Sequence, residues 1–146
     1  MDLYSISFII STIWVGPFWF AMLVRPYDKK TNTIMDKQLF FLGPIIVWFL
    51  IMILNPNGLI DFLNSGSHPD GFFAGLAQAM STKAGVSAMW AHMVAGDIFV
   101  TRWIWINCVK NNDKISLLRL SVFFGVMLMP LGLLIYLIFQ KKHVIK

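Results

Sequence analysis

The sequence predicts an all-α integral membrane protein, a bundle of four transmembrane helices with a short interfacial helix between the second and the third. Hydrophobic residues make up 58% of the 146 residues and charged residues only 13%, whereas soluble domains carry about 25% charged residues. Apolar runs of bilayer-crossing length recur along the chain, and most Lys and Arg residues lie between them. We therefore expect one domain, residues 1–146, in a membrane.

The first two spans are expected at about 3–24 and 39–55. The first run is free of charge along its whole length and matches the roughly 20 residues that cross hydrocarbon. The second run is shorter and can cross only with help from its flanking turns. Residues 25–38 between them read as a basic loop, and the turn residues Asn55-Pro56-Asn57-Gly58 are expected to end the second span.

The segment between the second and third spans is expected to hold a loop over 65–71 and one short helix ending near Met80. Phe72, Phe73, Leu76 and Met80 recur at spacings of three and four, which places them on one helical face. This pattern indicates an interfacial helix lying on the membrane, with a re-entrant segment as the alternative.

The third and fourth spans are expected at about 85–108 and 117–139, the fourth with a bend at Pro130-Leu131-Gly132. The loops after the first and third spans hold seven Lys and Arg residues, and the opposite side holds four. The positive-inside rule then places both termini outside the cytoplasm. The expected location is multi-pass, in a bacterial inner membrane or, in a phototroph, a thylakoid membrane.

The third predicted span carries the polar residues that indicate a site, His92, Asp97 and Arg102. A charge at bilayer depth costs roughly 2.5–3.5 kcal/mol, so each needs a partner or a function. At 3.6 residues per turn, His92 and Arg102 share one stripe, and Asp97 lies roughly 140° from each. The alternative is a structural polar cluster that fixes the register of the helices.

Several classes of site have little support. Cys108 is alone, and the chain has no HExxH, CxxC or paired-glutamate pattern, so no metal or other cofactor is expected. The net charge of +5 comes from cations in loops and the tail, so nucleic acid is not an expected partner. The N-terminal run has no basic n-region and no cleavage pattern, so neither a cleaved signal peptide nor a transit peptide is expected.

The pattern Trp90-x-His92-x-x-Ala95-x-Asp97-x-Phe99-x-x-Arg102 resembles the central helix of the abscisic-acid-deficient-four-like family. These are small four-span membrane proteins whose plant members act in neoxanthin synthesis. Two further stretches agree in the same order, Pro17-Phe18-Trp19-x-x-Met22-x-Val24-x-Pro26 and Pro130-x-Gly132-x-Leu134. The chain is identified as a bacterial-type member of this neoxanthin-synthase-type family.

The resemblance implies a carotenoid isomerase, which opens the 5,6-epoxide of violaxanthin to a tertiary alcohol and an allene without net redox change. Such a reaction needs an acid and a base. Our hypothesis gives these roles to Asp97 and His92 and makes Arg102 the group that orients or neutralises Asp97. Aromatic residues of the same helix are candidates for substrate binding, namely Trp90, Phe99 and Trp103.

Two other functions remain open at this point. One is a non-catalytic membrane subunit that binds pigment or another membrane protein, and the other is a proton or ion pathway through Asp97. The expected partners are the lipid bilayer, a carotenoid ligand, and an oligomer or membrane-protein partner. An apolar pocket beside Asp97 and His92 would favour the enzyme.

Overall fold

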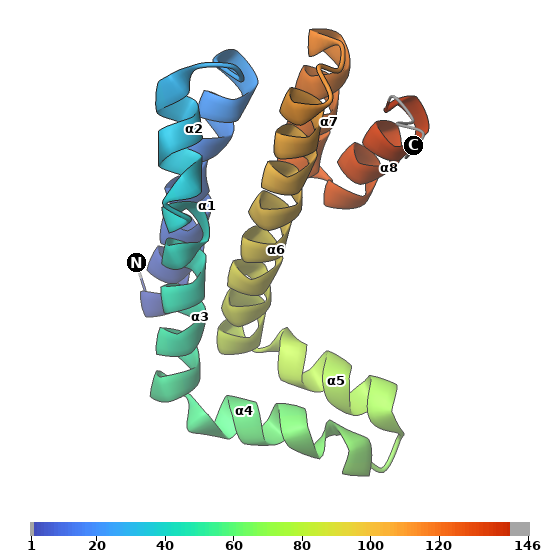
Figure 1. Cartoon of the computed structure of the whole chain (residues 1–146). Helices are drawn as coiled ribbons and strands as arrows, with labels where there is room; N and C mark the ends of the chain where they lie inside the picture. Colours follow the sequence, from blue (N-terminus) through green and yellow to red (C-terminus); the bar gives the residue numbers. More distant parts are fainter. Residues whose placement is uncertain (1, 141–146) are drawn as a thin grey trace. The chain divides into compact units, whose positions relative to one another are not determined.

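The computed structural model describes residues 2–140, and within that range the chain is mostly helical and has no β-strand. The predicted all-α class is therefore confirmed. Figure 1 shows the elements, which are α1 (Leu3–Val24), α2 (Lys29–Asp36), η1 (Leu39–Phe41), α3 (Leu42–Leu54), α4 (Pro56–Leu63), η2 (Asn64–Ser67), α5 (Phe72–Ser81), α6 (Lys83–Lys110), α7 (Ile115–Met127) and α8 (Met129–Phe139).

The contacts of the chain divide it into two compact units. Unit 1 holds the residues up to Trp14 together with Gly43–Met93, and unit 2 holds Val15–Leu42 and the chain from Val94 onward. Helices α1 and α6 each contribute residues to both units. Each unit has its own core, so each is described by itself.

The number of membrane-spanning helices differs from the prediction. Among the helices of residues 2–140, α1 alone is long and apolar enough to cross a bilayer by itself, and α2 with η1–α3 meets the same test only as a pair bent by 65°. Helix α6 has 28 residues, but polar side chains such as His92, Asp97 and Arg102 lower its hydropathy. The four predicted spans are therefore not confirmed, and one or two helices have the required length and composition.

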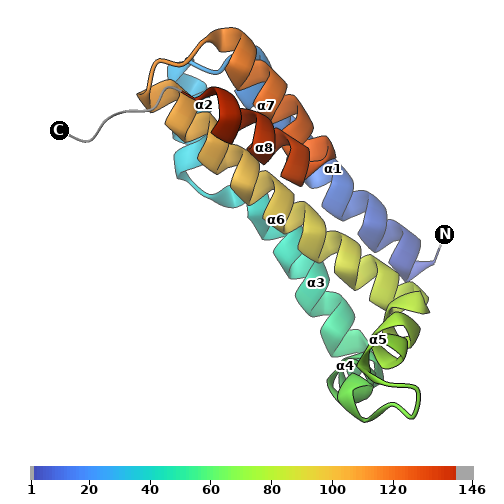
Figure 2. The same ribbon diagram turned by 90° about the vertical axis from the view of Figure 1, so that its right-hand side faces the viewer.

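The helix predicted over 117–139, with a bend at Pro130-Leu131-Gly132, is divided into two helices, and the break falls two residues before Pro130. Leu128 has non-helical backbone angles, φ −150° and ψ 78°, and it separates α7 from α8. The two helices pack against each other, and the chain reverses direction between them (Figures 1 and 2). A Cβ atom on Gly132 would collide with the backbone of Gly125 and the carbonyl of Ser121, so glycine is what allows this close packing. Pro130 lies in the first turn of α8, where its missing N–H costs nothing.

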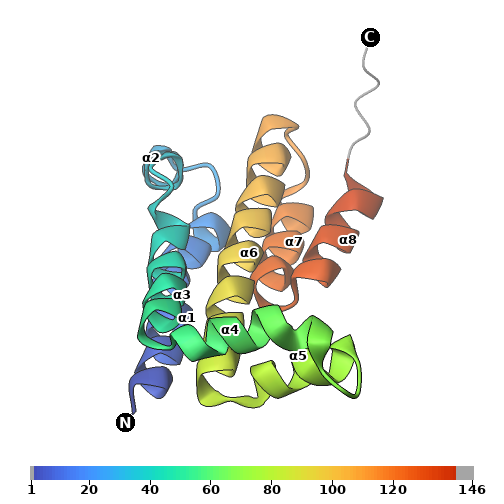
Figure 3. The ribbon, with the colours of Figure 1, turned by 90° about the horizontal axis from the view of Figure 1, so that it is seen from below.

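The short helix predicted to end near Met80 is present as α5, but the sequence analysis missed α4, so unit 1 holds a helical hairpin there. Helix α4 begins at Pro56, which suits a first helical turn, although the sequence around it reads as a stop. The chain runs out along α4, turns through η2 and returns along α5 (Figure 3). Gly75 permits this turn, because a Cβ atom there would collide with the Ser65 backbone and the His68 side chain.

The predicted basic loop over 25–38 contains a helix, α2. Asp28 is its N-cap, and the Asp28 carboxylate accepts a hydrogen bond of 2.9 Å from the Lys30 N–H. Thr31 and Met35 of α2 are buried in unit 2. Capping and this buried face explain why a segment rich in lysine folds here.

The core of unit 1 lies between α3 and α6. Val47, Ile51, Ala88 and Ala91 are buried there. The N-terminal part of α1 is tied to both helices, because the Tyr4 hydroxyl donates to the Asn55 side chain at 2.7 Å and the Ser87 hydroxyl donates to the Tyr4 carbonyl at 3.1 Å.

The core of unit 2 gathers large side chains from α2, η1, α6, α7 and α8. Its fully buried members include Met35, Phe40, Ile104, Trp105, Leu118, Val122 and Tyr136. Two side chains bond the backbone of distant segments: Trp19 Nε1 donates to the Val122 carbonyl at 3.1 Å, and Trp105 Nε1 donates to the Pro26 carbonyl at 3.0 Å. These bonds fix the inner faces of α1, α6 and α7 within the unit.

Candidate functional site

Unit 1 contains an apolar cavity of about 440 Å³ between α3, α4, α5 and α6. Its walls are mostly hydrophobic, and they come from Trp48, Met52, Gly58, Leu59, Phe62, Leu63, Ala79, Met80, Gly85, Ala88, Met89 and His92. Small-molecule sites have volumes of roughly 300–1,000 Å³ and are lined mainly by apolar and aromatic side chains. The cavity has both properties.

His92 is the only titratable residue among the described residues that line this cavity. The residue is exposed and also lines the cavity. No residue between 2 and 140 forms a hydrogen bond or an ion pair with it. Both ring nitrogens can therefore bond to a ligand, one as donor and one as acceptor in the neutral form.

Asp97 is not part of the cavity. It lies half-buried on α6 in unit 2, where its backbone carbonyl accepts a hydrogen bond of 2.7 Å from the Thr101 hydroxyl. The Asp97 carboxylate makes no hydrogen bond or ion pair within the described part of the chain. An apolar pocket beside both His92 and Asp97 would have favoured the enzyme, and of these two residues only His92 lines the cavity.

Arg102 bonds to the end of α2 and not to Asp97. Its Nε donates to the Met35 carbonyl at 3.0 Å, and its guanidinium lies 3.8 Å from an Asp36 carboxylate oxygen and 5.3 Å from the centroid of the Phe40 ring. The Arg102 side chain is 18% exposed, against 76% for Asp36. Arg102 therefore holds α6 to the α2–η1 corner of unit 2, in agreement with the structural alternative for this residue.

The three aromatic candidates also lie outside the cavity lining. Trp90 stacks on Phe8 with ring centroids 4.7 Å apart, and its Nε1 donates to the Thr12 hydroxyl at 2.8 Å, so it packs α6 against α1 in unit 1. Phe99 is 57% exposed, and Trp103, 45% exposed, contacts the Tyr136 ring edge-on at 5.5 Å. Their binding role stays a prediction.

Sequence reasoning missed the residues that form the walls of the cavity. Leu59, Phe62 and Leu63 follow one another at helical spacing after Pro56, and Trp48 and Met52 are four residues apart. That spacing is the signal that could have found them. Among residues 2–140, no group of three or more His, Cys, Asp or Glu side chains could hold a metal ion.

Together, the helices and the cavity define a class of protein: a small all-α protein with an apolar cavity lined by one histidine. The chain belongs to the ABA DEFICIENT 4-like family, whose model matches residues 6–136. This confirms the family resemblance seen in the sequence. The match covers residues of both units, including His92, Asp97 and Arg102.

A curated relative is Protein ABA DEFICIENT 4, chloroplastic, from Arabidopsis thaliana. It is 24% identical to this chain over 131 residues, which is 88% of the chain and 58% of the relative. The chain thus spans little more than half the length of that protein. No solved structure matches the chain.

Proposed function

We propose that this chain is a membrane protein that binds one end of a carotenoid-like isoprenoid in the His92 cavity and isomerises it without net redox change. The cavity is the observation that carries the proposal, because it is apolar, enclosed by four helices and supplied with one unbonded imidazole. The family supports a carotenoid as the substrate class, since the chain resembles proteins of neoxanthin synthesis.

The apolar outer surface supports membrane insertion. Large hydrophobic side chains are exposed on α1 and α3, among them Ile13, Phe20, Ile46, Phe49 and Ile53, whereas soluble monomers rarely expose large contiguous apolar patches. Helix α1 has 22 residues, which at 1.5 Å per residue gives about 33 Å and spans a hydrocarbon core of about 30 Å. We propose α1, bent α2–α3 and α6 as crossings.

Helices α7 and α8 are too short to cross singly. They have 13 and 11 residues, against the roughly 20 that a span needs. Because they pack against each other as a hairpin, we propose that they enter the membrane and return. The protein then has three crossings and one re-entrant hairpin instead of four crossings.

One imidazole is sufficient for the proposed chemistry. The reaction breaks the C6–O bond of a 5,6-epoxide and the C7–H bond, and it forms an O–H bond and the C6=C7 double bond of the allene. The epoxide oxygen and C7 are both attached to C6, so one ring can reach both. The imidazolium form of His92 donates a proton to the oxygen, and the neutral form then removes the C7 proton, which restores the starting state.

Binding without catalysis is the second candidate function. The observation in its favour is that His92 is the only titratable group among the described lining residues, whereas acid–base reactions are often divided between two groups. A protein of this kind would hold the pigment in the same cavity and leave it unchanged. Asp97 and Arg102 would then serve only to assemble unit 2.

Expression of the full chain in a host that accumulates violaxanthin tests both candidates. We expect a new allenic carotenoid, resolved by chromatography, and we expect His92→Ala to abolish it. His68→Ala is the matched control, because His68 bonds Gln78 in the α4–α5 hairpin and does not line the cavity. Asp97→Asn shows whether Asp97 takes part in the reaction.

The outcomes separate the candidates. Violaxanthin that copurifies unchanged with the protein, and is lost in His92→Ala, supports binding without catalysis. An unchanged pigment profile with no copurifying pigment in the correctly inserted protein contradicts both.

A further inference from the structure

Two grooves flank α7 in unit 2, away from the His92 cavity. One, of about 380 Å³, lies between α7 and α8, and the other, of about 560 Å³, lies between α7 and the end of α1. Ser116 and Leu120 line both grooves. These two residues therefore form a ridge with one groove on each side.

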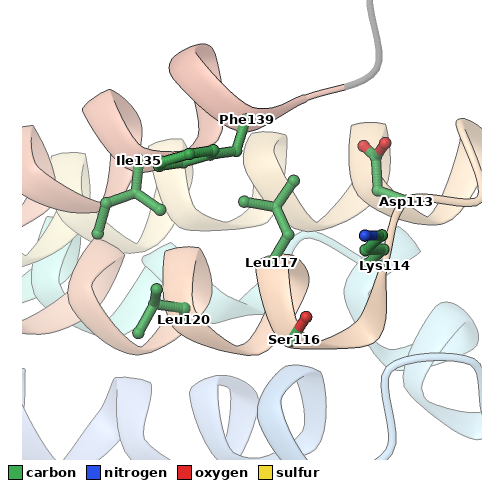
Figure 4. Close-up of a pocket in the computed structure, with 7 residues that line it drawn as sticks. All are labelled: Asp113, Lys114, Ser116, Leu117, Leu120, Ile135 and Phe139. Atoms are coloured by element: carbon green, nitrogen blue, oxygen red, sulfur yellow. The ribbon is translucent and has the colours of Figure 1, made fainter.

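Both grooves are polar at the start of α7 and apolar further along. In the first groove, Asp113 and Lys114 lie at one end and Leu120 and Ile135 toward the other (Figure 4). In the second, the polar residues are Ser116 and Arg119, and the apolar walls are Leu23, Val24, Leu120 and Phe123. Each groove thus offers polar residues for a lipid headgroup and apolar residues for an acyl chain.

The charge at the polar ends favours an anion. Lys114, the N-cap of α7, forms no side-chain cap bond, and the first amides of a helix attract phosphate. Arg119 Nε donates to the Leu23 carbonyl at 3.3 Å, which holds the guanidinium at the second groove and leaves its other N–H groups for a ligand. Lys114 and Asp113 line the first groove and Arg119 lines the second, so the two grooves together carry one net positive charge.

The net charge of unit 2 also favours an anionic ligand. The described residues of unit 2 contain eight Lys and Arg against four Asp, whereas those of unit 1 contain one Lys against three Asp. Cations near a membrane surface attract anionic lipids. The grooves therefore lie in the unit with the net positive charge.

We propose that the first turn of α7 binds the phosphate-bearing headgroup of an anionic diacyl phospholipid, with one acyl chain in each groove on either side of the Ser116–Leu120 ridge. This inference rests on the membrane part of the proposed function and not on the carotenoid reaction. The lipid is held by Lys114 and Arg119 at its headgroup and by α1, α7 and α8 along its chains.

Native mass spectrometry of the purified full chain tests the site, with phosphatidylglycerol and phosphatidylcholine of identical acyl chains as probes. We expect a preference for phosphatidylglycerol that falls about fivefold for each cation removed, in line with the attraction of one surface cation. Lys114→Gln with Arg119→Gln should therefore lose the preference, and Arg119→Lys should retain it. The control is Lys29→Gln with Lys30→Gln, which removes the same charge from exposed positions on α2 outside both grooves.

Three results would overturn the lipid site: no preference in the unsubstituted protein, an equal loss in the α2 control, or displacement of the lipid by free glycerol 3-phosphate. Alkaline extraction of membranes separates this failure from that of the proposed function. Release of the protein overturns membrane insertion and the lipid site together. Retention without a lipid preference overturns the lipid site alone.

Discussion

Two polar side chains of α6, Arg102 in unit 2 and His92 in unit 1, are used differently. In unit 2, Thr101, Arg102 and Trp105 each donate to a backbone carbonyl, and the last two reach distant segments of the chain. In unit 1, His92 has no such partner among the described residues and lines a cavity. The comparison of Arg102 with His92 teaches that a polar side chain in an apolar helix can hold the fold by bonding a backbone carbonyl, whereas one that has no such bond and also lines a cavity is a candidate for binding.

The largest expected effect is at Arg102. Arg102→Met removes the bond to the Met35 carbonyl and the contact with Phe40, and it should lower the free energy of unfolding by about 1.5–3 kcal/mol, the range for hydrogen bonds to charged groups. Thermal unfolding in detergent measures it. Asp36→Asn should cost less than about 1 kcal/mol, because Asp36 is exposed and its carboxylate lies as far as 3.8 Å from the Arg102 guanidinium. Equal losses in the two variants would show that the ion pair, and not the carbonyl bond, holds α6.

The second effect is at the close contact between α7 and α8. Gly132→Ala should lower the free energy of unfolding by about 1–3 kcal/mol, the usual cost of overpacking, because the new Cβ meets backbone atoms of Gly125 and Ser121. The control is Gly96→Ala on α6, where nothing lies within 4 Å; it should gain about 0.5–1 kcal/mol from helix propensity. A Gly132→Ala protein as stable as the parent would mean that the hairpin is not close-packed.

A smaller effect belongs to unit 1, where Lys83 and Asp2 are 2.6 Å apart. The hydrogen bond from Lys83 holds the pKa of the Asp2 carboxyl well below its usual range, and the same bond raises the pKa of Lys83. The stabilisation by ionised Asp2 is therefore complete above the usual aspartate pKa of 3.8 and declines as the pH falls below it. The part due to Lys83 is lost only when the pH rises through the raised lysine pKa.

Unfolding curves at a series of acidic pH values should show this contribution, and Asp2→Asn should remove it. Asp70→Asn is a suitable control, since Asp70 is an exposed acidic residue of the same unit. If Asp2→Asn leaves the loss of stability at acidic pH unchanged, the ion pair between Asp2 and Lys83 does not cause that loss.

The smallest effect on stability is expected at His92. His92→Gln should change the free energy of unfolding by no more than about 0.5 kcal/mol, as at ordinary surface positions, because no described residue bonds the imidazole. The same variant should abolish the new pigment if His92 moves protons. A large loss of stability would show that His92 is an anchor like Arg102, and the contrast between the two residues would disappear.

The long helices could be predicted from the sequence because their signals are local. The helix predicted at 3–24 coincides with α1, and the one at 85–108 lies within α6. Charge-free or periodic apolar runs of that length strongly favour a helix. The sequence predicts a bend at Pro130-Leu131-Gly132, and the helix breaks two residues earlier, at Leu128. The reversal of the chain there could not be predicted, because it is set by the backbone angles of Leu128 and by close packing between α7 and α8.

The site could be predicted only in part. His92 was a candidate because it is a titratable group in an apolar run, but its cavity is assembled from four helices whose apolar residues look ordinary one at a time. The partner of Arg102 could not be read from the sequence either, because it is the backbone carbonyl of Met35 and any residue supplies one. The residue types thus predicted which positions of α6 are polar. Only the fold determines which of these polar side chains form hydrogen bonds within the protein and which remain open to a ligand.

The reversal at Leu128 decides where the end of α8 lies. Phe139 lines the same groove as Lys114, so α8 returns to the end of the hairpin at which α7 begins. A topology reporter inserted at Asn111 and one placed after Gln140 should therefore report the same side of the membrane, whereas an unbroken span over 117–139 would place them on opposite sides. Under the proposed membrane insertion, the break at Leu128 thus replaces one crossing by a hairpin whose two ends lie on the same side.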